Sequence, residues 1–344
     1  KDIDEGLRVL ATGPAGKEIQ ILYLNECSLT VLPKEINEMK KIGMLSAASN
    51  KIHTIESAYP DISFTQLFLD NNQITSIPHF VNSDGKRMFF RIEDVETISF
   101  SYNKIKLFPD VFDADAGFAI ASVDFSYNEL EGFENEGNGY QGIYVQTLSL
   151  ANNPGFKKYP KCISDSGSKV DYINMRGCGI EEIPEGSFSG KNVKYLVSLD
   201  LSYNRLNDLP REFHAAHMPY FYGIDLSYNR FDAFPFEPFD CASLTMLAIR
   251  GKKKEKGERV PLLGSLREVL GAHAEGMLHW HDWIDYVNPD YGKQTINGDA
   301  NKKIIRTTPG RVIFNTIWPE GMGFVNGLVS KGKLSELILD TFNI

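Results

Sequence analysis

The sequence predicts an α/β solenoid of short parallel strands, followed by a smaller segment of different character. Two observations predict it: one phrase of apolar residues, asparagine and proline recurs along the first 250 residues, and the phrase then stops. Its clearest copies run from Leu199 to Asn204 and from Ile224 to Asn229, as (Leu/Ile)-Asp-Leu-Ser-Tyr-Asn. Self-similarity at a period of about 20–50 residues is typical of stacked repeats.

Nine copies of the phrase follow one another when the final residue of each is aligned. They are separated by 22 to 26 residues, except for one step of 31. The aligned positions are Cys27, Asn50, Asn72, Asn103, Asn128, Asn153, Cys178, Asn204 and Asn229. This regular interval predicts one coil of the solenoid for each copy.

The physical role of the phrase follows from its spacing. Leu199 and Leu201 lie two positions apart, so their side chains point to the same side of a strand. A single copy cannot bury them, whereas stacked copies enclose a continuous core. The asparagine stands where the chain leaves the strand, and its amide offers donors and an acceptor to the backbone of a buried turn. We therefore expect the nine aligned residues to form a structural ladder.

The complete phrase, L-x-x-L-x-L-x-x-(N/C)-x-L-x-x-(L/I/F)-P, resembles the leucine-rich repeat. The resemblance covers about residues 19–250 and implies a horseshoe of about nine to ten coils with parallel strands on its concave face. That family also accepts cysteine at the ladder position. The form, including the phrase from Phe239 to Thr245, resembles surface-type repeat proteins exported by bacteria, which implies an extracellular or cell-surface location.

Local patterns indicate further elements along the repeat region. Residues 1–18 are a linker or an N-terminal cap. Ile36, Met39 and Ile42 have the spacing of one face of a short helix on the convex side. The long step to the fourth copy contains an insertion from Val81 to Asp94, with a turn at residues 82–85. In four copies the residue before the asparagine is a tyrosine, and we expect these rings to pack along one edge rather than form a ligand cage.

The repeat ends after Ile249, where Lys252–Lys256 opens a basic junction at residues 251–259 that we expect to be a solvated loop. For the remaining residues, 260–344, we predict a smaller α+β or partly disordered segment, with a short helix over Val269–Leu278. Residues 307–308, 310–315, 319 and 324–326 closely resemble a segment of the bacterial RNA polymerase β′ subunit. Two unrelated pieces therefore share one chain, either as a natural fusion or as a recombined or built sequence.

The β′ resemblance carries over no catalytic residue. Nucleotidyl transfer needs clustered carboxylates that hold two Mg²⁺ ions, and the Asn-Ala-Asp-Phe-Asp-Gly-Asp motif that supplies them in β′ is absent from this sequence. A transcription-related role as a fragment or fusion of β′, in the cytoplasm, remains the alternative function.

Charge is distributed unevenly. The chain has a net charge of −9, and residues 252–344 carry 13 Lys or Arg and 11 Asp or Glu, which leaves −11 on residues 1–251. An acidic repeat region argues against a nucleic-acid partner for it. No run of about 18 apolar residues is present, so we expect no membrane-spanning segment.

The strand positions that alternate with the core leucines are the candidate partner-binding residues. Adjacent strands lie about 4.8 Å apart, so these side chains form a continuous surface for a protein or glycan. They are Tyr23, Asn25, Phe68, Asp70, Ser99, Ser101, Asp124, Ser126, Asn174, Arg176, Asp200, Ser202, Asp225 and Ser227.

Enzymatic and metal chemistry find little support, so we expect no catalysis, cofactor or metal. Asp200 and Asp225 form a candidate carboxylate pair, but both belong to the repeat consensus. The neighbouring serines lack a histidine in register. A group at His273, His279 and His281 lacks the spacing of a metal-binding helix. The four cysteines, without a C-x-x-C motif, predict isolated thiols, with a Cys162–Cys178 bridge as the alternative.

Overall fold

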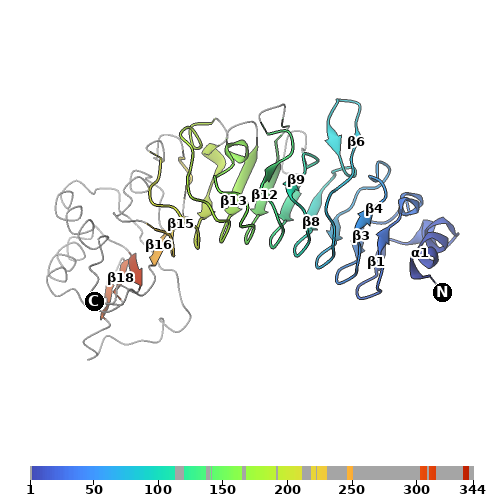
Figure 1. Cartoon of the computed structure of the whole chain (residues 1–344), viewed down its shortest axis with the longest axis horizontal. Coiled ribbons are helices and arrows are strands. Elements are labelled where there is room, and N and C mark those ends of the chain that lie inside the picture. Colours follow the sequence, from blue (N-terminus) through green and yellow to red (C-terminus); the bar gives the residue numbers. More distant parts are fainter. Residues whose placement is uncertain are drawn as a thin grey trace. The chain divides into compact units, whose positions relative to one another are not determined.

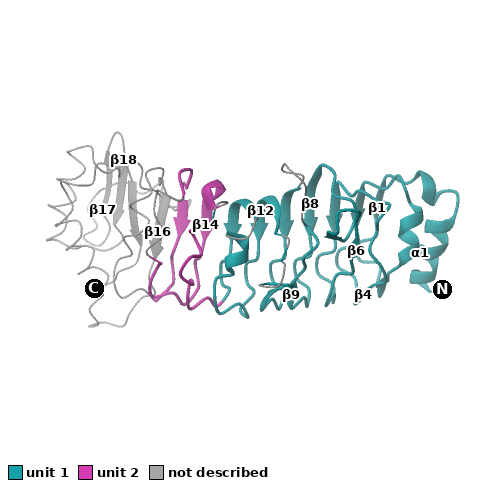
Figure 2. Cartoon of the chain, turned by 90° about the horizontal axis from the view of Figure 1, so that it is seen from above, with its two compact units in different colours: residues 1–178, 190–192 teal, residues 179–189, 193–344 magenta. Residues whose placement is uncertain are grey.

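The computed structural model describes residues 2–230 without 113–119, 137–139, 141, 165–167, 191–192, 211–217 and 222, and beyond residue 230 it describes the backbone of four strands. The chain divides into two compact units, residues 1–178 with 190–192 and residues 179–189 with 193–344, coloured separately in Figure 2. The division falls directly after the aligned position Cys178.

The first unit is built on one parallel sheet with a strand for each of the first seven predicted coils (Figure 1). Leu45 of one strand faces Leu22 and Leu67 of its two neighbours, so the same repeat position aligns in successive coils. This register confirms the predicted parallel solenoid. The strands are β1 (Ile21–Tyr23), β3 (Met44–Ser46), β5 (Gln66–Phe68), β8 (Val95–Ser99), β10 (Ile120–Asp124), β12 (Tyr144–Ser149) and β13 (Lys169–Asn174).

The core of this unit consists of the repeated aliphatic positions and a set of phenylalanines. Leu45, Ile98 and Leu148 are fully buried at the same position of their coils. Phe100 and Phe125 stack with ring centroids 5.1 Å apart. Burying one such side chain stabilises the fold by about 1.5–3 kcal/mol. Because these contacts join neighbouring coils, each coil depends on the next for stability.

Helical structure is short in the described part of the chain. It comprises α1 (Ile3–Thr12) and the 3-10 helices η1 (Gly16–Glu18), η2 (Lys34–Glu38), η3 (Lys161–Ile163) and, in the second unit, η4 (Val193–Tyr195). The expected convex helix is η2, which turns Ile36 into the core, and Met39 and Ile42 are also buried. A repeat of 22 to 26 residues also has to hold a strand, a turn and a return segment, which leaves little length for a helix.

Helix α1 is tied to the first two coils. The Asp2 side chain accepts the Asp4 N–H at its N-terminus, and the Asp4 carboxylate accepts the backbone N–H and the hydroxyl of Thr30. The Arg8 guanidinium bridges Glu35 at 2.6 Å and Glu56 at 2.5 Å. Since an end coil of a solenoid otherwise exposes its core face, this helix has the contacts of an N-terminal cap.

The insertion in the long repeat step is a β-hairpin, whose first strand, β6, is marked in Figure 1. Strands β6 (Phe80–Val81) and β7 (Arg87–Met88) pair antiparallel. The Asn82 side chain accepts the N–H of Lys86 at 2.8 Å, and Gly85 has φ +79°, a conformation that favours glycine. The predicted turn at residues 82–85 is confirmed. The hairpin is joined to the next coils by an Arg87–Glu134 ion pair at 3.0 Å.

Four two-residue strands form two further parallel pairs in the first unit. They are β2 (Val31–Leu32) with β4 (Thr54–Ile55), and β9 (Leu107–Phe108) with β11 (Gly132–Phe133). These pairs follow the ladder position of their coils, so they repeat along the stack outside the main sheet.

The second unit continues the parallel pattern with β14 (Ser198–Asp200), β15 (Gly223–Asp225) and β16 (Met246–Arg250). Beyond residue 250 the backbone of β19 (Glu336–Asp340) pairs parallel with β16 and with β18 (Gly310–Phe314), and β18 pairs antiparallel with β17 (Lys303–Thr307). The predicted junction at 251–259, the helix at Val269–Leu278 and the histidine group lie outside the described residues.

None of the helices in the described ranges has the length and apolar character needed to cross a membrane.

Candidate binding surface

A left-handed residue ends each strand segment and turns the chain toward the ladder position. Residues 26, 49, 71, 102, 127, 152, 177, 203 and 228 all have φ between 53° and 67°. Only Gly177 is a glycine, whereas four are tyrosines. A non-glycine residue in this region costs roughly 1–2 kcal/mol, so the same local strain is accepted in coil after coil to make this turn.

The ladder asparagines satisfy the backbone that this turn exposes. The Asn128 Oδ1 accepts the Ile105 N–H at 3.0 Å, and its Nδ2 donates to the carbonyl oxygens of Phe100 at 2.8 Å and Phe125 at 3.1 Å. Asn50, Asn72, Asn103, Asn153, Asn204 and Asn229 repeat the pattern of an accepted N–H from the preceding coil and carbonyl bonds within their own coil.

Cysteine occupies the ladder at two coils. The Cys178 Sγ donates to the Leu150 carbonyl at 3.0 Å, so it keeps one inter-coil bond of an asparagine. The Cys27 Sγ lies 3.4 Å from the Asn25 carbonyl. Cys27, Cys162 and Cys178 are free thiols, so no bridge joins Cys162 to Cys178. Burial raises the pKa of the Cys162 thiol well above its usual range, which keeps it protonated and unreactive.

We call the strand side chains that alternate with the buried core positions the outer face of the sheet. The predicted binding residues on this face have three levels of exposure. Tyr23 and Asn25 are exposed. Partly exposed residues are Phe68, Asp70, Ser101, Asp124, Asn174, Arg176 and Asp200. Buried residues are Ser99, Ser126, Ser202, Asp225 and Ser227.

Acidic and amide side chains on this face accept hydrogen bonds from the protein itself. The Oδ1 atoms of Asp200 and Asp225 each accept the N–H two residues later at 2.8 Å, from Ser202 and Ser227. Asp124 and Asn174 do the same at 2.7 and 3.1 Å. This bond satisfies an N–H at the end of the strand, which explains physically why the repeat keeps aspartate or asparagine there.

Serine hydroxyls join these carboxylates into short networks. Ser99 and Ser101 both donate to Asp70 Oδ1, the latter at 2.7 Å. The Ser126 hydroxyl bonds Asp124 at 2.5 Å and lies 2.7 Å from the Ser149 hydroxyl. The carboxylates therefore serve as fixed acceptors, and these serines donate to carboxylates rather than to a histidine.

Sequence reasoning found Tyr23 and Phe68 but missed three other apolar members of the outer face, Ile21, Met44 and Tyr172. Ile21 is 58% exposed and Tyr23 is 62% exposed on β1, and Ile21 pairs with the partly exposed Met44 of β3. On β13, Tyr172 is 41% exposed. Ile21, Met44 and Tyr172 each precede the first core leucine position of their coils, and reading that position across the copies would have found them.

The tyrosines of the turn pack in pairs as expected. Tyr102 and Tyr127 stack with centroids 4.2 Å apart and planes 7° from parallel, and Tyr203 and Tyr228 stack at 4.2 Å. A hydrogen bond that the Tyr102 hydroxyl donates to Tyr127 raises the pKa of the Tyr102 phenol. Stacking is worth about 0.5–1.5 kcal/mol, which offsets part of the left-handed strain in these coils.

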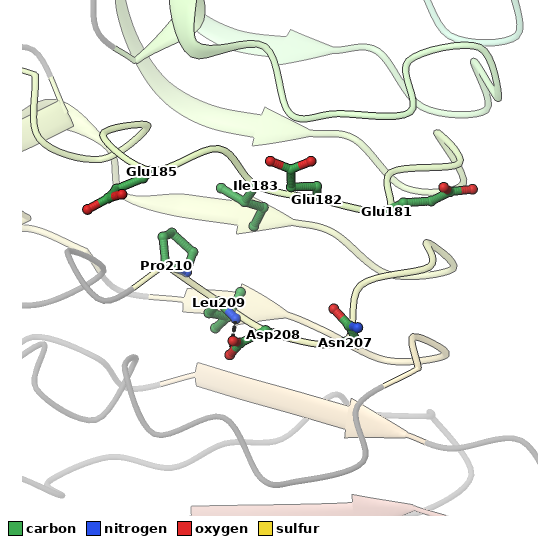
Figure 3. A pocket seen from close by; sticks show the side chains of 8 residues that line it. All are labelled: Glu181, Glu182, Ile183, Glu185, Asn207, Asp208, Leu209 and Pro210. Carbon is green, nitrogen blue, oxygen red and sulfur yellow. Dashed lines mark hydrogen bonds between the residues drawn. The ribbon is translucent and has the colours of Figure 1, made fainter.

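An acidic hollow of about 480 Å³ lies between two consecutive coils of the second unit (Figure 3). Its lining includes Glu182, Glu185 and Asp208 beside the apolar Ile183 and Leu209. Glu181, at one end, pairs with Arg205 at 2.8 Å. Within the described ranges, no three His, Cys, Asp or Glu side chains form a group suited to a metal ion.

Comparison with known proteins agrees with this geometry. A family model of the leucine-rich repeat matches residues 195–215. A leucine-rich repeat protein from Bacteroides eggerthii DSM 20697 is 34% identical, with a TM-score of 0.66 over 75% of this chain and 42% of that one. The described solenoid of parallel strands is thus similar to leucine-rich repeat structures. A leucine-rich repeat protein from Bacteroides thetaiotaomicron VPI-5482 is 31% identical, also with a TM-score of 0.66, over 75% of this chain and 31% of that one.

The similarity to RNA polymerase is confirmed for part of the chain. The β′ subunit of Opitutus terrae is 57% identical over 93 residues, which is 27% of this chain and 7% of that protein. The chain thus spans a small fraction of the curated relative it matches, and less than half of each leucine-rich repeat structure.

Proposed function

We propose that the leucine-rich repeat solenoid is a non-enzymatic scaffold that binds a protein or glycan partner through the outer face of its sheet, the concave face of the expected horseshoe. The observation that carries this proposal is the exposed set of side chains at one end of that face, on a backbone held rigid by the ladder. A rigid frame lowers the entropy that binding has to offset.

Support for a non-enzymatic role comes from the hydrogen bonds of the candidate catalytic groups. The Asp200 and Asp225 carboxylates each accept a backbone N–H, and the Ser99 and Ser101 hydroxyls donate to Asp70. Groups held in this way stabilise the strand ends. Leucine-rich repeat proteins act in general as binding scaffolds, so the fold also supports a non-enzymatic binding role.

The test is a binding screen of the full chain on arrays of purified proteins and glycans. The affinity of each bound target is then measured for wild type and three variants. Tyr23→Arg on β1 and Thr147→Arg on β12 each place a long charged side chain on the outer face, and Leu107→Arg is the control, at a residue that is 47% exposed on β9 outside the main sheet. The proposal expects at least one outer-face variant to lose binding and Leu107→Arg to keep it. Unchanged binding by both outer-face variants would contradict it.

We also propose an extracellular or cell-surface location for the repeat scaffold. The resemblance of the phrase from Phe239 to Thr245 to exported repeat proteins supports this location. Protease treatment of intact cells, followed by detection of the chain, tests it: loss of the full-length protein is expected, and complete protection would overturn the proposal.

A transcription-related role is the second candidate, because the chain shares 57% identity with RNA polymerase β′ over 93 residues. The acidic repeat region carries no conserved catalytic motif of that enzyme, so the role would be association with polymerase. Co-purification of core polymerase with the full chain, and its loss on deletion of 252–344, would favour this role over the surface scaffold.

A further inference from the structure

We propose that the N-terminal end of the outer face is the anchor site for a protein partner, whose contacting segment carries an apolar side chain flanked by lysine or arginine. This inference rests on the proposed scaffold function and narrows it to one site and one class of partner. The site, called the β1–β5 apolar surface, consists of Ile21, Tyr23, Met44 and Phe68.

Strand register places these four side chains together. Ile21 is paired with Met44 on the neighbouring strand. Tyr23 is paired with Ser46, which is paired with Phe68. Adjacent strands are about 4.8 Å apart, so the two rings flank a single small serine. The Tyr23 hydroxyl lies 3.5 Å from the Met44 sulfur, which joins the two rows.

The exposure of this surface is greater than its structural role requires. Ile21 and Tyr23 are 58% and 62% exposed, whereas the buried Leu22 between them is 9% exposed and supplies the core contact. Exposed apolar side chains that gather in one place mark interaction sites more often than isolated ones do. Tyrosine, phenylalanine and methionine are also the residue types enriched in protein interfaces.

The chemistry favours a protein over a glycan. Ile21 and Met44 offer neither hydrogen-bond donors nor a flat ring face, and a sugar buried against them would leave hydroxyls without partners, which is costly. An apolar side chain of a protein segment loses only its exposure to water there. Aromatic and aliphatic contacts at the centre of an interface supply most of its binding energy.

The charge around this surface indicates which charge the partner should carry beside its apolar side chain. Residues 18–72, which hold the first three coils, carry four lysines and seven acidic residues. Lys40 and Lys41 are paired with Asp61 and Glu18, and Arg8 is paired with Glu35 and Glu56. Glu26, three residues after β1 ends at Tyr23, is exposed and makes no ion pair within the described part of the chain. Because this carboxylate follows the surface on the same coil, it favours a basic residue in the partner.

The experiment selects random displayed peptides on the immobilised full chain and measures the affinity of the enriched sequence for variants. Tyr23→Ala removes the most exposed ring of the surface. Tyr172→Ala is the matched control, because it removes another exposed tyrosine from the same sheet face, on β13. Tyr23 is 62% and Tyr172 41% exposed, so neither belongs to the buried core and both variants should fold, which thermal melting curves verify.

The proposal expects an enriched sequence with an apolar residue beside lysine or arginine. Tyr23→Ala should weaken its binding at least about tenfold, as for a hot-spot residue, while Tyr172→Ala should leave it within about twofold. Affinity should fall with added salt, and Glu26→Gln should reduce both the affinity and that salt dependence.

Other outcomes separate this inference from the scaffold function. Binding lost with Tyr172→Ala but kept with Tyr23→Ala overturns the anchor site and keeps the scaffold function. Binding insensitive to both variants overturns both. Failure to enrich any peptide overturns the anchor site, as does enrichment without basic residues. A glycan array signal lost with Tyr23→Ala would replace the protein partner with a sugar.

Discussion

The ladder makes a quantitative prediction for Asn128, which is 6% exposed in the middle of the first unit. Replacing Asn128 with alanine removes one acceptor and one donor group from a buried turn. The Ile105 N–H, bonded at 3.0 Å, then loses its partner. The Phe100 carbonyl loses its bond at 2.8 Å and keeps the one from the Asn103 side chain at 3.1 Å. Both groups belong to the preceding coil, so the change weakens the interface between two coils.

The expected loss follows from the cost of buried unpaired groups. A buried N–H left unpaired costs about 1–3 kcal/mol and a lost hydrogen bond about 0.5–1.5 kcal/mol, so Asn128→Ala should destabilise the first unit by about 2–4 kcal/mol. Asn128→Cys is the matched variant, because Cys178 holds the equivalent position and donates to the Leu150 carbonyl at 3.0 Å. It should restore the second bond to the Phe100 carbonyl but leave the Ile105 N–H unpaired, so it should lose about 1–3 kcal/mol.

Urea unfolding followed by far-UV circular dichroism measures these differences, and amide hydrogen exchange locates them. The Ile105 N–H should lose protection in Asn128→Ala, while amides in β1 and β3, two coils or more away, should keep it. The ladder argument is refuted if Asn128→Ala unfolds at the wild-type urea concentration, or if Ile105 protection is unchanged.

Three other predictions concern the turn, the cap and the stacked tyrosines. Gly177→Ala should destabilise the fold by about 1–2 kcal/mol, because Gly177 has φ +67° and the added Cβ would lie 2.8 Å from Asn152 Oδ1. Gly6→Ala, in open space on α1, should instead stabilise the fold by about 0.5–1 kcal/mol. Urea unfolding measures both, and a shift of the two midpoints in the same direction would contradict the prediction. The Arg8 hydrogen bond lowers the pKa of Glu56, so the stabilising effect of this pair is present above the ordinary glutamate pKa and disappears as pH falls through the lowered folded-state pKa. Thermal melts should show this loss of stability at acid pH in wild type and not in Arg8→Gln. Identical pH profiles of the two proteins would contradict the prediction. Tyr127→Phe should bring the raised pKa of Tyr102 back toward the ordinary phenol value. Ultraviolet absorbance titration of wild type and variant would detect this as a difference between the two curves, and no change would show that Tyr127 is not the cause.

Much of the fold could be predicted because the spacing of the repeat phrase indicates both the strand positions and the stacking of the coils. Two-residue alternation places Leu199 and Leu201 on one side of a strand, and the constant interval implies register between coils. The insertion of residues 81–94 was visible as one long step, with a glycine where the hairpin turn needs positive φ. These features depend on local geometry, which sequence spacing records.

Features that depend on contacts between coils were harder to predict. The same Leu-Asp-Leu-Ser phrase is compatible with an aspartate that faces a ligand and with one that accepts its own backbone N–H, and the hydrogen bonds of Asp200 and Asp225 distinguish the two. The burial of Ser202 and Ser227 depends on packing, not on spacing. Helix α1 lies in a stretch without repeat periodicity, and its position depends on Arg8 reaching two separate coils.

The central claim is that the outer face of the sheet binds the partner. The most direct measurement is photo-crosslinking of the full chain to a target identified by array screening, with a photoreactive residue placed at Tyr23 or Thr147 on that face, or at Leu107 outside it. The account predicts covalent adducts from at least one of the two outer-face positions and none from Leu107. Adducts from Leu107 alone would show that the partner binds elsewhere on the solenoid.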